Sequence, residues 1–260
     1  MISLEGRSYG PGTLHLTADR VADFVEVTGD DSSRWTDAAP PGFAASALFV
    51  VAPELLGEVV GPVIHGEQTF VWHGPLRIGE ILTVTGTVSK VRERGGVHYL
   101  GFDITAVSDG VTVLEGGSLF LVTGESLPAT SDFERPEPPQ SHRGDPGPGQ
   151  RAASRADLVR YAAATRDWNP IHWDHDAAVA AGLPGVVAHG LLQGSWALES
   201  ASQHRSGSVP LKSTKLRFRS PLLPARPVNL VTDVTRNVAS VSVSDLDNEY
   251  LNARVELSDE

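Results

Sequence analysis

The segment SRADLVRYAAAT, Ser154–Thr165, repeats the plan of TADRVADFVEVT, Thr17–Thr28, in the first half of the chain. Each segment begins with a Ser or Thr that can cap a helix, and its apolar residues recur at helical spacing. The next nine residues align without a gap, GDDSSRWTD at 29–37 against RDWNPIHWD at 166–174. Identities are few, but the aligned pattern predicts an internal repeat.

The repeat continues into PGFAASAL at 41–48 and PGVVAHGL at 184–191. Each of these leads into an apolar stretch of helical length, 45–57 in the first half and 190–202 in the second. Runs rich in Val, Ile, Thr and Phe then predict strands. These strands span 68–73, 81–91, 97–107 and 111–122 in the first half, with hairpin turns at Gly95-Gly96 and Asp109-Gly110, and 213–219, 228–236, 238–244 and 250–257 in the second.

Each half is therefore predicted to be an α+β unit in which an antiparallel sheet wraps around one apolar helix. A Pro/Gly-rich segment at 126–150 separates the two halves. Such a segment cannot hold a helix or a central strand, so it is interpreted as an extended linker. We predict one domain at 1–125 and a second at 151–260.

Composition narrows the class of protein. The 260 residues carry a net charge of -11, with 32 acidic against 21 basic side chains, which argues against general nucleic-acid binding. Cysteine is absent, so disulfides, thiolate metal sites and a cysteine nucleophile are excluded. No apolar stretch approaches the ~20 residues of a membrane span, and the N-terminus lacks the apolar core of a signal peptide. A cytoplasmic protein without membrane contact is expected.

The residues that can do chemistry begin at Asp167. Asp167 and His172 stand on either side of Asn169-Pro170, and a turn is predicted there because Pro170 disfavours helix at Asn169. A turn can bring a carboxylate and an imidazole to one point, where they form a general acid/base pair around one water. Gly190 opens the second apolar helix, and its free backbone N–H can bind a carbonyl oxygen that gains negative charge.

The pattern Asp-x-Asn-Pro-x-His-x-Asp at 167–174, followed by Ala-His-Gly at 188–190, resembles the hydratase signature of the MaoC-like, (R)-specific enoyl-CoA hydratase family. The first half, with HGEQTF at 65–70 and WHGPLRIGE at 72–80, is similar to the N-terminal hotdog of two-domain dehydratases in that family. A matching phrase, FRSPLL, stands at 218–223 in the second half. The resemblance covers nearly the whole chain and implies a double hotdog fold.

The resemblance also implies roles for individual residues. Asp167 and His172 would hold the water that adds across, or leaves from, the C2–C3 bond of an enoyl thioester. Gly190 would supply the oxyanion N–H to the thioester carbonyl, and Asn169 would support the acid/base pair. His189 is expected to support the site as a packed or hydrogen-bonded structural histidine, with its neighbour's backbone doing the chemistry.

The first half has lost the pair. Trp35 stands where the second half has its catalytic histidine, and Ser32 replaces the asparagine. Ser46-Ala47 replaces the His-Gly that opens the second apolar helix, and Asp30 survives without its partner. One active site per chain is therefore predicted, and the family precedent is that such a non-catalytic half shapes the acyl-chain pocket.

Four further side chains are candidate substrate contacts. Trp168 and Trp173 flank the predicted pair and are expected to wall the pocket, although packing alone would also explain them. Lys215 and Arg217 alternate along one predicted strand, so they share a face of the sheet. That face is either solvated surface or a contact for the phosphates of coenzyme A or for an acidic carrier protein.

A metal site is the alternative for the polar run that includes His172, Asp174, His175 and Asp176. Contiguous polar residues usually diverge or cap a helix, so no metal is predicted. Asp174 is expected to be the N-cap of a short helix that reaches Ala181.

The function predicted is the reversible hydration of trans-2-enoyl thioesters to (R)-3-hydroxyacyl thioesters. It needs no cofactor beyond the coenzyme A or acyl carrier protein of the substrate itself. One alternative is a hydratase for a short branched or dicarboxylic acyl-CoA, for which Arg166 is the nearest extra cation. Another is a non-catalytic acyl-thioester binder or partner subunit of a separate hydratase. Two hotdog units in one chain can form the pseudo-dimer by themselves, so a monomer and a homodimer of such chains both stay open.

Overall fold

The computed structural model describes residues 4–123, 147 and 149–259. The elements of the first half are β1 (Ser8–His15), α1 (Ala18–Thr28), the 3₁₀ helices η1 (Ser32–Arg34) and η2 (Pro41–Ala44), α2 (Ala45–Glu58), β2 (Val63–Trp72), β3 (Ile81–Arg94), β4 (Val97–Ser108) and β5 (Val111–Thr123). Those of the second half are β6 (Gln150–Arg151), α3 (Arg155–Thr165), the 3₁₀ helix η3 (Pro170–His172), α4 (His175–Ala180), α5 (Gly190–Ser202), β7 (Leu211–Phe218), β8 (Val228–Thr235), β9 (Val238–Ser244) and β10 (Glu249–Leu257).

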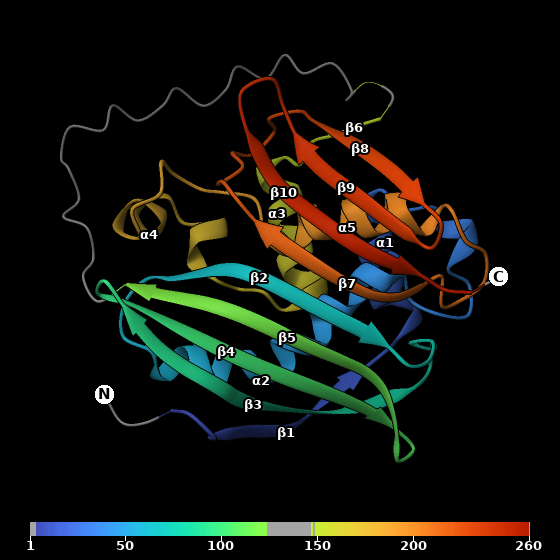
Figure 1. Ribbon diagram of the computed structural model, residues 1–260, viewed down its shortest axis with the longest axis horizontal. Coiled ribbons are helices and arrows are strands. Elements are labelled where there is room, and N and C mark those ends of the chain that lie inside the picture. The colour runs from blue at the N-terminus through green and yellow to red at the C-terminus, as the bar shows by residue number, and fades with distance from the viewer. Residues whose placement is uncertain (1–3, 124–146, 148, 260) are drawn as a thin grey trace.

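All strands of the described chain form one antiparallel sheet, in the order β1-β3-β4-β5-β2-β7-β10-β9-β8-β6. Each half therefore contributes one continuous side of the sheet, and β2 and β7 lie next to each other where the halves meet (Figure 1). The pairing there runs from Glu67 opposite Arg217 to Val71 opposite Ser213. Backbone hydrogen bonds thus join the halves edge to edge.

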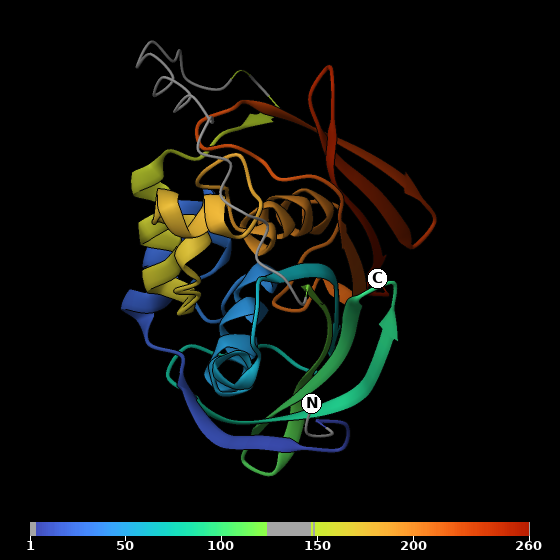
Figure 2. The same ribbon diagram turned by 90° about the vertical axis from the view of Figure 1, so that its left-hand side faces the viewer.

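The sheet curves around α2 and α5, so that both helices lie inside it (Figure 2). Leu48 and Leu55 of α2 and Leu192 and Trp196 of α5 are fully or almost fully buried. Burial of each such side chain stabilises the fold by about 1.5–3 kcal/mol. The helices α1 and α3 pack against each other, and the Arg20 guanidinium donates to the Ala164 carbonyl at 2.9 Å. The pattern predicted for each half, a sheet wrapped around one apolar helix, is confirmed.

The repeat is also visible in the helix ends. Thr17 and Ser154 cap α1 and α3 with their side chains, as predicted. Both helices end at a residue in the left-handed conformation, Gly29 with φ 70° and Arg166 with φ 72°. The backbone therefore has the same conformation at the C-terminal ends of α1 and α3.

Two strands were not predicted from the sequence. β1 contains Gly10, Pro11 and Gly12, which hide the strand pattern, and its register shifts between Tyr9 and Gly12. An edge strand tolerates such residues because half of its hydrogen-bonding groups face no neighbour. β6 is only two residues long.

The linker predicted at 126–150 lies outside the described residues except for 147, 149 and 150. Within the described part of the chain, no helix is both long and apolar enough to cross a membrane.

Candidate active site

The loop after α3 carries the predicted acid/base pair. Thr165 ends the helix with its hydroxyl donating to the Tyr161 carbonyl at 2.8 Å. Arg166 follows in the left-handed conformation, at the position that glycine occupies in the first repeat. A residue with a Cβ pays about 1 kcal/mol or more for that conformation. The left-handed conformation of Arg166 turns the chain, and Asp167 directly after it lies in the interior.

The turn predicted at Asn169-Pro170 is present. The Asn169 side chain accepts a hydrogen bond from the Ile171 N–H at 3.4 Å and caps η3, and Pro170 is the first residue of η3. His172 is the last residue of η3, and its ring lies near the carboxylate of Asp167. Asn169 supports the pair through the backbone, by shaping the loop that carries both side chains.

Asp167 and His172 are buried, with 7% and 8% of their surfaces exposed. His172 Nε2 lies 4.0 Å from Asp167 Oδ2. This distance is too long for a direct hydrogen bond and suits one water that bonds to both atoms. His172 Nδ1 lies 2.8 Å from the Val187 carbonyl oxygen, which can only accept, so Nδ1 carries a proton and donates to it. Nε2 then faces the carboxylate across the gap.

Burial dominates the electrostatics of Asp167. Loss of water raises the pKa of the carboxyl above its usual range, because the charged form is penalised inside the protein. His172 and the Asn169 N–H oppose this effect without cancelling it. A carboxylate whose proton affinity is raised is a stronger base than a solvated aspartate.

His189 holds both partners in place. Its ring stacks on the ring of His172, with centroids 3.8 Å apart and an angle of 26°. Its Nε2 lies 3.3 Å from the Asp167 carbonyl oxygen, to which it donates. Burial lowers the pKa of His189 well below its usual value, with a further contribution from His172, so the ring stays neutral. These contacts fit the packed, hydrogen-bonded histidine that was expected from the sequence, and its supporting role in the reaction stays a prediction.

Gly190 is the first residue of α5, so its N–H has no acceptor within the helix. A Cβ at this position would lie 2.9 Å from Phe218 Cδ1, which leaves room for glycine alone unless the ring moves. The positive end of the α5 dipole and the free N–H together form a place for an oxygen that gains negative charge. Gly190 follows His189 in the chain, and the His189 ring stacks on the ring of His172.

Ligand-type atoms of Asp167, His172 and His189 lie within 4.8 Å of one another. The two imidazoles are stacked, however, so their lone pairs point along nearly parallel planes and do not converge on one ion. The other metal alternative fails for a different reason, because Asp174 Oδ1 accepts from the N–H groups of Asp176 and Ala177 and caps α4 as predicted. The stacking of the two rings argues against a metal ion, and the absence of a metal stays a prediction.

The first half holds a modified copy of the pair. The Trp35 indole N–H donates to Asp30 Oδ1 at 2.9 Å, so the surviving aspartate is bonded to the residue that replaced the histidine. The indole has no acceptor nitrogen, and it cannot position a water as imidazole can. Asp30 and Trp35 are therefore a structural remnant of the site.

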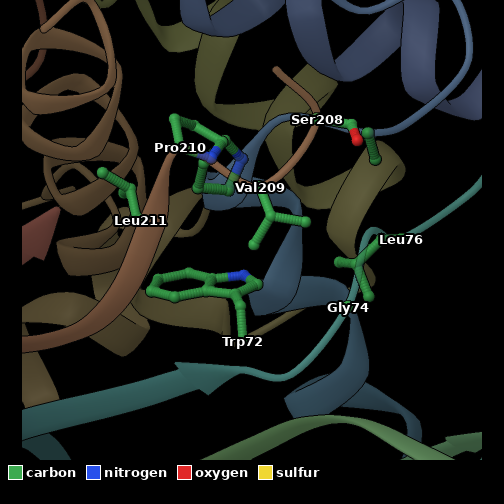
Figure 3. Close-up of a pocket in the computed structure, with 9 residues that line it drawn as sticks. Trp72, Gly74, Leu76, Ser208, Val209, Pro210 and Leu211 are labelled. Atoms are coloured by element: carbon green, nitrogen blue, oxygen red, sulfur yellow. The ribbon is translucent and has the colours of Figure 1, made fainter. Parts of the chain in front are cut away.

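The pocket of this copy is closed. The repeat aligns Trp72 with Phe218, and Figure 3 shows Trp72 gathered with Val209, Pro210 and Leu211 around a small cavity. The cavity has a volume of about 10 Å³, room for roughly one water. No acyl chain fits in this cavity, and one active site per chain stays a prediction.

Comparison with known proteins gives the family. The model of the MaoC-like domain matches residues 138–249, and that of the FAS1-like dehydratase domain region matches 3–115. 3-Hydroxyacyl-thioester dehydratase X of Mycobacterium tuberculosis is 25% identical over 234 residues, which cover 85% of this chain and 79% of that protein. A UPF0336 protein of Streptomyces coelicolor is 33% identical over 116 residues, 38% of this chain and 77% of its own length. The chain belongs to the MaoC-like dehydratase family.

Solved structures agree with this MaoC-like assignment at the level of the fold. The crystal structure of HtdX from Mycobacterium tuberculosis superposes with a TM-score of 0.76 at 20% identity, over 97% of this chain and all (100%) of that one. A second protein of that organism, described as a double hotdog, superposes with a TM-score of 0.66 at 12% identity, over 97% and 96% of the two chains. This MaoC-like protein is thus a double hotdog, as the sequence predicted. The family match and the relative named as a dehydratase make it a hydro-lyase, which was also predicted.

The remaining candidate residues of this MaoC-like dehydratase lie further out. Trp168 and Trp173 are about half exposed, at 47% and 46%, and the Trp173 indole donates to the Trp168 carbonyl at 3.3 Å. They border the loop that carries the pair. A role for them in walling the pocket stays a prediction.

Lys215 and Arg217 share a face of β7, as predicted, but it is the face that points away from the site of the MaoC-like half. Leu216 faces α5, where a Cβ on Gly194 would lie 2.7 Å from Leu216 Cδ1, so its neighbours point outward. Both cations bind Glu67 of β2, at 2.7 Å from Lys215 Nζ and 3.0 Å from Arg217 Nε. They also border an open groove on the outer face, between β7 and strands β8–β10. Contact with substrate phosphates there stays a prediction.

Proposed function

We propose that this chain catalyses the reversible syn hydration of trans-2-enoyl thioesters to (R)-3-hydroxyacyl thioesters. The observation that carries the proposal is the buried Asp167–His172 pair, whose facing atoms are 4.0 Å apart. The helix α5, which begins at Gly190 after the stacked His189, supplies a free N–H for the same site in this proposal. Membership of a dehydratase family and a relative named 3-hydroxyacyl-thioester dehydratase support the same substrate class.

In the proposed reaction, one water donates one hydrogen bond to Asp167 Oδ2 and one to His172 Nε2, and it keeps one of these two protons as the hydroxyl group at C3. Both atoms are acceptors when the carboxyl is ionised and the His172 proton is held on Nδ1 by Val187. The water oxygen keeps its lone pairs free and attacks C3. The proton that leaves the water passes through the Asp167–His172 pair to C2 on the same face, and the atoms of one water are thereby added.

The Gly190 N–H stabilises the charge that develops on the thioester oxygen while the C2–C3 double bond is lost. Such a donor acts on the transition state more than on the ground state, because the oxygen carries more charge there. The reverse reaction removes water by the same steps.

A panel of trans-2-enoyl-CoA substrates of increasing chain length tests the proposal, together with the same acyl groups on a carrier protein. We expect hydration of at least one of them, with the (R)-3-hydroxyacyl product resolved by chiral chromatography. An (S) product, or no hydration by the purified chain alone, would contradict it. The second outcome would favour a partner subunit of another hydratase.

The dicarboxylic alternative finds less support. It requires a cation in the pocket, whereas Arg166 is exposed at the C-terminal end of α3. Comparison of crotonyl-CoA with mesaconyl-CoA in the same assay separates the two substrate classes.

Removal of metal ions is expected to leave the activity within twofold of its starting value. The proposed chemistry uses water, one carboxylate, one imidazole and one backbone N–H, and the stacked histidines do not converge on an ion. Prolonged dialysis against a chelator followed by the hydration assay measures this. A loss that added Zn²⁺ reverses would contradict the mechanism.

A further inference from the structure

His65 comes from the first half, yet it lies at the active site of the second. A bulge in β2 between His65 and Glu67 breaks the regular alternation of side chains and turns His65 inward. Gly66 makes the bulge possible, because a Cβ there would lie within 2.4 Å of a Leu121 methyl group. The His65 ring contacts the rings of Phe120 and Phe218, each at 4.9 Å between centroids.

Phe218 connects His65 with the oxyanion site. One part of its ring covers Gly190, where a Cβ would be 2.9 Å from Cδ1, and the ring also packs against His65. His65 is therefore next to the place where the thioester oxygen is proposed to bind. The electrostatic influence of His172 on His65 shows that the acid/base pair is near as well.

One ring nitrogen of His65, Nε2, is not used by the fold. Nε2 is buried and has no hydrogen-bond partner among the described residues. A buried nitrogen without a partner destabilises the fold, because it has given up its hydrogen bonds to water. Burial also lowers the pKa of His65 to about 4, against hydrogen bonds with Gln68 and Glu67, so the ring is neutral at physiological pH. A neutral, unpaired imidazole nitrogen is ready for a ligand that is not charged.

The repeat supplies an internal comparison. The alignment of Trp72 with Phe218 places Leu211 where the first half has His65, and Leu211 lies beside Trp72 in the closed pocket of Figure 3. In the closed pocket, which lacks the acid/base pair, this position is thus occupied by the apolar side chain of Leu211. In the pocket with the acid/base pair, the same position is His65.

We propose that His65 is a substrate-positioning residue, contributed by the non-catalytic half, whose Nε2 forms a hydrogen bond with the thioester head of the bound substrate. This inference rests on the proposed function, and it gives the first half a polar role in addition to shaping the acyl pocket. The unpaired nitrogen is then satisfied only when substrate is present.

His65→Leu copies the residue of the closed pocket and tests the proposal. We expect KM for crotonyl-CoA to rise about tenfold with kcat changed less than about threefold, since loss of one hydrogen bond that is equal in ground and transition state weakens binding alone. The dissociation constant of butyryl-CoA, which cannot react, should rise by the same factor. His65→Gln, which keeps a polar end, should recover part of the binding.

Thermal stability separates this role from a structural one. His65→Leu removes an unpaired buried polar atom, so its Tm should equal or exceed that of the wild type while binding weakens. His15→Leu, an exposed histidine on the edge strand β1, is the matched control and should leave KM unchanged.

The outcomes are distinguishable. KM and butyryl-CoA binding within twofold of the wild type in His65→Leu would overturn the inference and leave the proposed function standing. Should the wild type bind butyryl-CoA but hydrate no enoyl thioester, the proposed function fails and the binding data still decide on His65. If the wild type binds no acyl-CoA, both are overturned.

Discussion

Asp167→Asn is expected to lower kcat/KM for enoyl-thioester hydration by about 10³, the middle of the range for loss of a general base. The amide keeps the shape of the side chain and cannot take a proton from water. Because the group is buried 4.0 Å from His172 Nε2, solvent hydroxide or buffer has little access to replace it. Steady-state kinetics with crotonyl-CoA measure the loss.

The same carboxyl sets the acid side of the pH profile. Its pKa is raised above the ordinary value of 3.8 by burial, so kcat/KM should fall as pH drops through an apparent pKa higher than that of a solvated aspartate.

The effect of the same carboxyl on stability has the opposite dependence on pH. The folded protein binds this proton more tightly than the unfolded chain does, so the stabilisation is complete below the unfolded pKa and is lost as pH rises through the folded pKa. At pH 7, Asp167→Asn should therefore raise Tm.

Asp30→Asn is the matched control. It changes the aspartate at the same position of the first repeat, which is half-buried and bonded to Trp35. We expect kcat/KM within twofold of the wild type, because the closed pocket beside it has no room for substrate. An Asp167→Asn enzyme that keeps more than a tenth of the activity, or equal losses in the two variants, would contradict a single active site on Asp167.

Local pattern was sufficient to predict much of this architecture. The helix predicted at 190–202 is α5 residue for residue, and the short turn at Asn169-Pro170 is where the proline required it. Both depend on neighbouring residues alone: the apolar spacing of the helix and the restricted backbone of the proline. The family resemblance then supplied roles that geometry now makes plausible for Asp167, His172 and Gly190.

Features that depend on distant contacts were not predictable. The alternation of Lys215 and Arg217 indicated that they share a face, but only the packing of Leu216 on α5 shows that it is the outer one. In the sequence, His65 belongs only to the segment at 65–70 that resembles the N-terminal hotdog of the family. Its place beside Phe218 depends on a bulge and on pairing between β2 and β7, which no local pattern encodes. The repeat contained one signal that could have identified His65, because the aligned position of the second half is Leu211.

Duplication explains why such a histidine can arise in a half without chemistry. In a hotdog pair joined by β2 and β7, each pocket takes its acid/base loop from one half and a wall from the other. In this structure Trp72 lines a small cavity with Val209 and Leu211, while His65 of β2 packs against Phe218 of β7. Substitutions on β2 therefore affect a site whose catalytic residues all come from the second half.

Gly190→Ala is expected to lower kcat by about 10², the effect of displacing a catalytic donor by about an ångström. The added Cβ would lie 2.9 to 3.2 Å from three atoms of the Phe218 ring, so either the ring or the start of α5 must move. Movement of α5 shifts the N–H away from the thioester oxygen. The N–H itself remains, and the loss therefore measures position and not the presence of the donor.

Trimming the opposing ring tests that explanation. In the double variant Gly190→Ala, Phe218→Leu the new methyl group has space, and kcat should recover about tenfold relative to Gly190→Ala alone, a coupling that a double-mutant cycle isolates. Phe218→Leu by itself should cost less than about fivefold, by loosening His65, which fits loss of packing without loss of a donor. Kinetics for all four proteins, with Tm as a check on folding, give the coupling. If the double variant is as slow as Gly190→Ala, the clash with Phe218 is not the cause, and the oxyanion role of the α5 N-terminus loses its geometric basis.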